Sequence, residues 1–83
     1  MQKENSVVSI REYGRIRSKL KSVLEKRNMT RNELARLVGT RFEVIDKWYR
    51  DDVKKIDADI LAKICYVLHC GVADILEYDA PNG

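Results

Sequence analysis

The sequence predicts an all-α fold of five short helices packed around one core. Three observations lead to this fold class. Apolar residues recur at helical spacing through almost all of the chain from Tyr13 onward. Only four glycines and one proline are present to interrupt helices. The 83 residues leave room for a single core, so the helices must share it.

The first helix is expected to end near Asn28. Its start is not fixed by the pattern, because Gly14 weakens helical continuity and the earlier "SVVSI" is rich in β-branched residues that favour strands. We assign residues 1–12 to an N-terminal extension, a candidate dimer arm, and residues 13–78 to the folded domain. The apolar face of the helix is formed by Ile16, Leu20, Val23 and Leu24.

The second and third helices meet within "TRNELARLVGTRFEVIDKWYR", residues 30–50. Thr30 and Glu33 have the spacing of a capping box, which predicts the start of the second helix. Gly39 is expected to end it, because glycine readily adopts positive φ. The third helix is expected from about Arg41 to Arg50. Trp48 is expected in the core and not in contact with a ligand. Its inward positions are Val44 in part, Ile45 and Trp48.

The last two helices follow a charged loop, "DDVKK". Asp57 is expected to cap the fourth helix, which "HCG" interrupts. "VADILEY" then predicts a short fifth helix, and residues 79–83 a flexible tail. The inward positions of the fourth helix are Ile60, Leu61, Ile64, Cys65 and Leu68.

Charge is distributed unevenly along the chain. Residues 1–50 carry 13 Lys and Arg against 6 Asp and Glu, whereas residues 51–83 carry 3 against 7. This asymmetry favours a polyanion partner on one face. The alternative is that the charged side chains only keep the helix surfaces hydrated and bind no partner. No apolar run of about 18 residues occurs, which argues against a membrane span. The start, "MQKENSVVSI", lacks the apolar core of a signal peptide, which predicts a cytoplasmic protein.

Cys65, His69 and Cys70 are the candidate metal ligands. Three donors without a second cluster make a poor zinc site, so we expect both cysteines to be small buried apolar residues. We therefore predict no metal and no cofactor. The chain has a single histidine and no evident pair of nucleophile and base, so we predict neither enzymatic activity nor a small-molecule substrate.

Ala35, Gly39, Ile45 and Trp48 have the spacing of a helix-turn-helix. A small residue such as Ala35 allows close helix crossing, and Gly39 provides the tight turn. Ile45 and Trp48 would then fix the inner side of the next helix. Such a steep crossing lets that helix project from the surface.

These residues also carry a family resemblance. "MTRNELARLVGTRFEVIDKW" resembles the phage-repressor (Cro/XRE-type) helix-turn-helix family, and the resemblance continues through "KKIDADILAKICYVLHCGVADILEY". It implies a lambda-repressor-like, all-α fold in which the second and third helices form the helix-turn-helix. Members of the family bind specific DNA sequences, usually as dimers. The resemblance implies no enzymatic activity and no cofactor.

By this resemblance, the helix from Arg41 to Arg50 is the recognition helix. Arg and Lys can bond to guanine, Glu can accept from cytosine, and an apolar ring can contact the thymine methyl group. The candidate base contacts are Arg41, Phe42, Glu43 and Lys47. The candidate phosphate contacts are Thr30, Arg31, Arg50, Lys54 and Lys55. The alternative is that the four cations among them interact only with water.

The leading hypothesis is a transcriptional regulator that binds double-stranded DNA as a homodimer on a palindromic site, with half-sites ~34 Å apart. Acidic residues near the same surface oppose phosphate binding, although Asp46 can pair with Arg50 one turn on. The alternative is therefore a protein-interaction module, an antirepressor or partner subunit, that keeps the fold without specific DNA binding. The acids concerned are Glu43, Asp46, Asp51 and Asp52.

Overall fold

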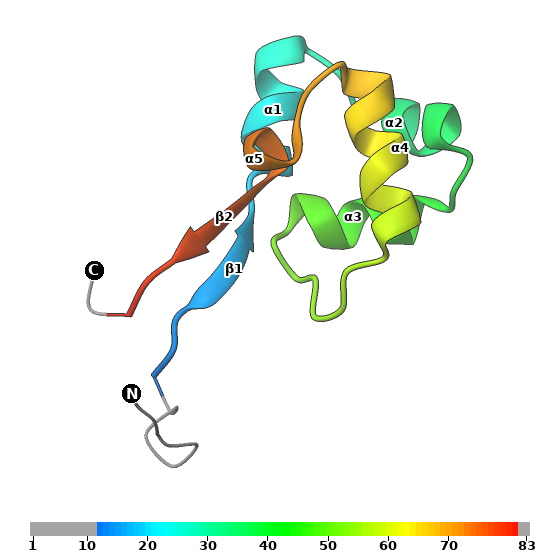
Figure 1. Ribbon diagram of the computed structural model, residues 1–83. Coiled ribbons are helices and arrows are strands. Elements are labelled where there is room, and N and C mark those ends of the chain that lie inside the picture. The colour runs from blue at the N-terminus through cyan, green and yellow to red at the C-terminus, as the bar shows by residue number, and fades with distance from the viewer. Residues whose placement is uncertain (1–11, 82–83) are drawn as a thin grey trace.

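The computed structural model describes residues 12–81 and shows a helical body from which a two-stranded ribbon extends (Figure 1). Five helices form the body within this part of the chain. The elements in chain order are β1 (Arg15–Ser18), α1 (Leu20–Arg27), α2 (Arg31–Val38), α3 (Phe42–Tyr49), α4 (Ala58–Leu68), α5 (Val72–Ile75) and β2 (Leu76–Asp79).

The prediction of an all-α fold is wrong in one respect, because β1 and β2 form an antiparallel sheet. Ile16 pairs with Tyr78, and Arg17 pairs with Glu77. The Arg17 guanidinium also donates to Glu77 at 2.9 Å and to Asp79 at 3.0 Å. Arg17 and Asp79 are 62 positions apart in the sequence, so local periodicity could not reveal their contact.

The first helix begins later than expected, because the preceding residues belong to β1. Gly14 has a φ of +81°, and a Cβ there would collide with the carbonyl oxygen of Asp79. The N–H of Lys19 donates to the carbonyl of Ile75 at 2.7 Å, so α5 holds the chain just before α1. Ile16, expected on the apolar face of the helix, lies in the ribbon and is 49% exposed.

The segment "VADILEY" is helical only in its first half. α5 ends at Ile75, and the following residues form β2 as far as Asp79, one residue into the segment that we expected to be a tail. The short helix is capped by Asp74, which accepts the N–H of Gly71 at 2.8 Å. The expected extension, apart from Glu12, and the last two residues of the tail lie outside the described residues.

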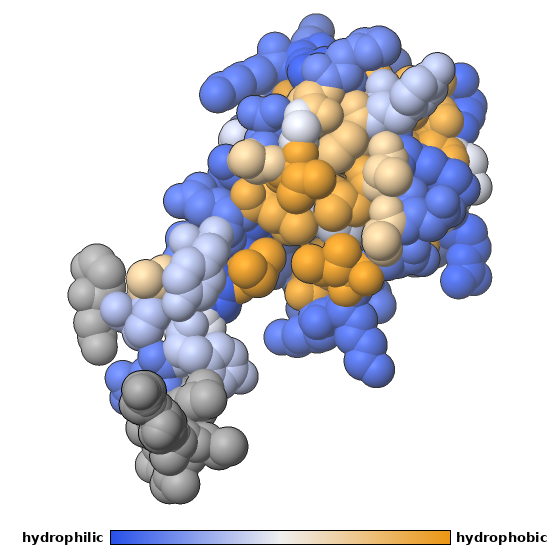
Figure 2. All heavy atoms as spheres, in the orientation of Figure 1, coloured by the Kyte–Doolittle hydropathy of each residue, from blue (hydrophilic) through white to orange (hydrophobic). Residues whose placement is uncertain are grey.

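The core lies between the helices and includes all three helix-turn-helix residues expected inside, Ala35, Ile45 and Trp48. Further hydrophobic residues are only partly buried, and Figure 2 shows hydrophobic side chains in the middle of the helical body with hydrophilic ones around them. The buried hydrophobic residues are Leu20, Leu24, Leu34, Ala35, Val38, Ile45, Trp48, Ile64, Leu68 and Ile75.

The predicted helix ends are confirmed at three positions. Thr30 and Glu33 form a capping box at the start of α2. Gly39 ends α2 in the left-handed conformation, with a φ of 81°. Asp57 caps α4 by accepting two backbone N–H groups of its first turn. These signals are local, which is why the sequence could show them.

Candidate nucleic-acid interface

The turn between α2 and α3 brings the two helices together. The N–H of Gly39 donates to the carbonyl of Ala35 at 2.9 Å, and the N–H of Thr40 donates to the same carbonyl at 3.0 Å. A Cβ added at Gly39 would meet nothing within 4 Å. Glycine is therefore needed at this turn for its positive φ and not for space.

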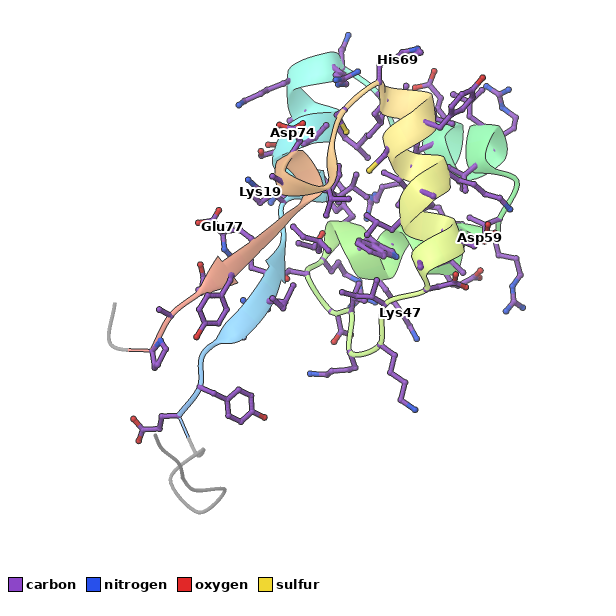
Figure 3. All side chains as sticks on the ribbon, viewed as in Figure 1. Lys19, Lys47, Asp59, His69, Asp74 and Glu77 are labelled. Carbon is purple, nitrogen blue, oxygen red and sulfur yellow. The ribbon has the colours of Figure 1, made fainter. Side chains whose placement is uncertain are left out.

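α3 has a buried side and an exposed side. Ile45 and Trp48 fix the buried side in the core. Glu43, Lys47 and Arg50 are exposed and follow one another at intervals of four and three residues, so they form one row, which we call the α3 stripe. Figure 3 shows Lys47 at the lower edge of the helical body, beside the loop that follows α3. The helix-turn-helix thus presents charged side chains outward from a fixed helix.

The other two predicted base contacts lie where α3 begins. Arg41 is the N-cap residue of α3 and is exposed. Phe42 is half-buried, and the guanidinium carbon of Arg31 lies 5.5 Å from the centroid of its ring. The structure therefore exposes Arg41, Glu43 and Lys47 but partly covers Phe42.

The Asp46 carboxylate lies between two arginines. Its Oδ1 accepts from Arg31 Nη1 at 2.7 Å, and its Oδ2 accepts from Arg50 Nε at 2.9 Å. Burial alone would raise the pKa of Asp46, but the hydrogen bonds and charges of Arg50 and Arg31 outweigh it and lower that pKa. The predicted pairing of Asp46 with Arg50 is confirmed, and Arg31 is a second partner that the sequence did not indicate.

The N-terminus of α2 is partly occupied by the chain's own groups. Thr30 donates its N–H to Glu33 Oε1 at 2.9 Å, and the N–H of Glu33 donates to Thr30 Oγ1 at 3.0 Å. The N–H groups of Arg31 and Asn32 have no partner within the helix, because they belong to its first turn. An anion can therefore still approach this helix end through backbone donors.

The loop after α3 is attached to β1 by Asp51, which has a φ of 59°. Its Oδ1 accepts the N–H of Ser18 at 2.8 Å, and its Oδ2 accepts from Arg15 Nη2 at 2.8 Å. Burial acts to raise the pKa of Asp51, but the Ser18 hydrogen bond and the Arg15 charge lower it overall. Asp51 is thus paired and fixes the loop, and its expected opposition to phosphate binding stays a prediction.

Lys54 and Lys55 extend from the same loop. Together with Lys47 they line a surface hollow of about 500 Å³, which Asp52 and Asp57 also border. The structure thus places one predicted base contact beside two predicted phosphate contacts. Thr30, Arg31 and Arg50 do not line this hollow.

A second hollow, of about 530 Å³, lies between β1, α1 and the end of α3. Sequence reasoning did not find it, because Ile16 and Leu20 were expected on one helix, whereas the structure places them in β1 and α1. Most of its cations already have partners, and Lys19 Nζ lies 3.7 Å from Glu77 Oε1 where the ribbon meets α1 (Figure 3). Its charged residues are Arg17, Lys19, Lys21, Glu25, Arg50 and Asp51.

The candidate metal ligands lie away from the α3 stripe. Figure 3 shows His69 and Lys47 at opposite ends of the helical body, and His69 ends α4 with a φ of 53°. Cys65 and Cys70 are free thiols, and burial together with the neighbouring Cys65 raises the pKa of Cys70. Within residues 12–81, no group of three His, Cys, Asp or Glu side chains could hold a metal ion.

Residues 19–81 match the family model of the Cro/C1-type helix-turn-helix DNA-binding domain. The chain belongs to this family. The resemblance drawn from the sequence is thereby confirmed for 63 consecutive residues that include α2, the turn and α3. In the part of this Cro/C1-type chain that the structure describes, no helix is long and apolar enough to cross a membrane.

Two solved structures are similar to this Cro/C1-type chain. The transcriptional regulator VanUg is 25% identical, with a TM-score of 0.69 and a match that covers 94% of this chain and 99% of VanUg. A Bacteroides fragilis protein for which DNA binding has been suggested is 21% identical, with a TM-score of 0.67 and coverage of 76% and 100%. The second likeness shows a shared fold alone. No curated protein gives a significant match.

Proposed function

We propose that this Cro/C1-type protein is a transcriptional regulator that recognises a specific DNA sequence by placing α3 in the major groove. The observation that carries the proposal is the α3 stripe, a row of charged side chains on a helix whose other side is fixed in the core. An α-helix with its side chains is ~10–12 Å across, which suits a major groove ~12 Å wide. The family is typically non-enzymatic, and we propose no catalytic activity.

Base recognition is assigned to residues of α3 and to its N-cap residue, Arg41. Arg41 and Lys47 would bond to guanine, and Glu43 would accept from the amino group of cytosine. Phe42 would contact a thymine methyl group. Phe42 is half-buried whereas the other three residues are exposed, so we expect it to contribute least to sequence preference.

Backbone recognition is assigned to two places beside α3. Lys54 and Lys55 would bind the phosphates of one strand next to Lys47, in the hollow that these three lysines share. Thr30 would contact a second phosphate, at the N-terminus of α2. Arg31 and Arg50 were also candidates, but both are bonded to Asp46.

We further propose that two copies bind a palindromic site together. The ribbon supports this, because its paired residues Ile16 and Tyr78 are 49% and 57% exposed, and Tyr13 beside them is 65% exposed. A two-stranded ribbon is rarely stable without further packing, so a second copy would stabilise it. Sedimentation equilibrium of the full chain tests this proposal. A monomer at every concentration, with and without DNA, would contradict it.

The protein-interaction module remains a second candidate because of a separate apolar surface. Leu37 and Tyr66 are 50% and 81% exposed and line a hollow of about 480 Å³ between α2 and α4. Its other apolar walls are Val38, Ala62 and Val67. Such a surface fits a protein partner better than DNA. It does not overlap the α3 stripe, so both activities can be tested in one protein.

Selection of bound duplexes from a random-sequence pool tests the proposed function. Enrichment of a palindrome with half-sites ~34 Å apart is the expected result for a dimer of this family. Binding that falls steeply with salt but enriches no sequence would contradict sequence-specific recognition. Absence of binding even at low salt would favour the protein-interaction candidate, and the Leu37 and Tyr66 surface would then be the first to mutate.

A further inference from the structure

Arg31 joins the first turn of α2 to the middle of α3 through Asp46. The distance from Arg31 Nη1 to Asp46 Oδ1 is 2.7 Å, and Arg50 Nε lies 2.9 Å from Oδ2 of the same carboxylate. The sequence led us to expect Arg31 and Arg50 on phosphates, and Asp46 either as an acid that opposes phosphate or as a partner of Arg50. In the folded domain these three charges are bonded to one another.

Two aromatic rings also hold the Arg31 guanidinium. Its central carbon lies 4.4 Å from the ring centroid of Tyr49 and 5.5 Å from that of Phe42. Phe42 precedes Asp46 by four residues and Tyr49 follows it by three, so all three lie on one side of α3. The faces of aromatic rings attract guanidinium groups. Arg31 therefore contacts α3 at three positions spread over two turns.

This arrangement fixes the rotation of α3 about its own axis. Successive residues of a helix are ~100° apart, so a rotation by one residue would remove all three contacts with Arg31. The same rotation would turn the α3 stripe, because Lys47 directly follows Asp46. The side chains that meet the bases thus depend on a residue of α2.

The same contacts reduce the positive charge available to DNA. The Asp46 side chain is only 19% exposed, whereas those of Arg31 and Arg50 are 40% and 54% exposed. A DNA phosphate offers arginine the same bidentate chemistry as a carboxylate. A phosphate that approached either arginine would have to compete with Asp46.

We propose that Arg31 is a positioning residue for α3 and that Asp46 withholds Arg31 and Arg50 from DNA phosphates. This inference rests on the proposed function and specifies how α3 is oriented in it. Arg31 then belongs to the determinants of sequence preference and not to the phosphate contacts. Asp46 lowers the affinity for all sequences alike.

Three variants of the full chain test the proposal. Asp46→Asn removes the competing charge, Arg31→Met removes the guanidinium but keeps the length of the side chain, and Glu25→Gln is the control. Glu25 is an exposed acid of α1 that lies outside the hollow of Lys47, Lys54 and Lys55 and makes no ion pair among the described residues, so its loss changes net charge equally. For each variant, binding is measured against salt concentration, and preferred sequences are selected from a random pool.

For Asp46→Asn, the slope of log affinity against log salt should steepen by ~0.9 for each arginine released to a phosphate. Glu25→Gln should leave the slope as in the wild type. For Arg31→Met, the slope should not change, but the preferred sequence should broaden. A slope that falls by ~0.9 in Arg31→Met would identify Arg31 as a phosphate contact and overturn the positioning role. An unchanged slope in Asp46→Asn would overturn the role of Asp46.

A measurement without DNA separates this inference from the proposed function. The free energy of unfolding is determined for wild type, Arg31→Met, Asp46→Asn and the double variant. The proposal predicts strong coupling, so that the double variant loses less stability than the two single variants combined. Additive losses of unfolding free energy would overturn the proposed role of the Arg31–Asp46 pair, even if the protein bound no DNA. Strong coupling in a protein that fails to bind DNA would support the structural role of the Arg31–Asp46 pair and reject the proposed function.

Discussion

The hydroxyl group of Ser18 donates a buried hydrogen bond of 2.7 Å to the carbonyl oxygen of Trp48. The bond joins the end of β1 to α3. Ser18 Oγ also accepts the N–H of Leu20 at 3.3 Å, at the start of α1. A single serine therefore links the ribbon, α1 and α3, and this explains why the segment before Leu20 is not an extension of the helix.

Ser18→Ala is expected to destabilise the fold by ~1–2 kcal/mol. The cost is limited because the carbonyl of Trp48 keeps a second hydrogen bond, from the N–H of Asp51 at 3.2 Å. Urea unfolding measures the loss. Ser22→Ala is the matched control, since Ser22 is exposed on α1 and should change stability by less than ~0.5 kcal/mol. Equal effects of the two variants would refute the role of Ser18.

Asp51→Asn is expected to weaken the acid dependence of stability. The folded pKa of Asp51 lies below its ordinary value of 3.8, so its contribution is present above that pH and is lost as pH falls through the folded pKa. The variant should be less stable than the wild type near neutral pH, and the difference should shrink in acid. Unfolding followed over a series of pH values checks this, with Asp52→Asn as the control. A difference that is the same at every pH would contradict the account.

Lys54→Ala is expected to weaken binding to all DNA sequences by a similar factor. Its loss should lower the magnitude of the salt slope by ~0.9, because one phosphate contact disappears. Lys63→Ala is the control, since Lys63 is a lysine of α4 paired with Asp59 at 3.0 Å and lies outside the hollow of Lys47 and Lys54. An unchanged slope in Lys54→Ala would remove Lys54 from the phosphate contacts.

Much of the fold was predictable because its signals are local. Thr30, Gly39 and Asp57 mark helix ends through the chemistry of their own side chains and backbone, and the structure has them in those roles. The ribbon was not predictable, because Ile16 and Tyr78 are far apart in the sequence and pair only in the folded chain. The apolar spacing of β1 and α1 continues without a break in the sequence, which is why one helix was expected.

The site was predictable in outline and not in its contacts. Helical spacing placed Ile45 and Trp48 inside and Lys47 outside, as the structure has them. It could not show that Arg31, 15 positions earlier, would bond to Asp46. Such a pair depends on the angle between α2 and α3, which no local pattern determines. The spacing of Asp46 and Arg50 within one helix was enough to predict their contact.

The most direct test of the account is sequence selection with Lys47→Ala beside the wild type. If α3 reads bases in the major groove, the variant should lose preference at one base pair of each half-site, worth ~1–3 kcal/mol of discrimination, and keep the rest of the site. Lys63→Ala should enrich the wild-type site unchanged. If Lys47→Ala enriches the same site and binds every sequence more weakly by the same factor, Lys47 contacts a phosphate and the proposed docking of α3 is contradicted.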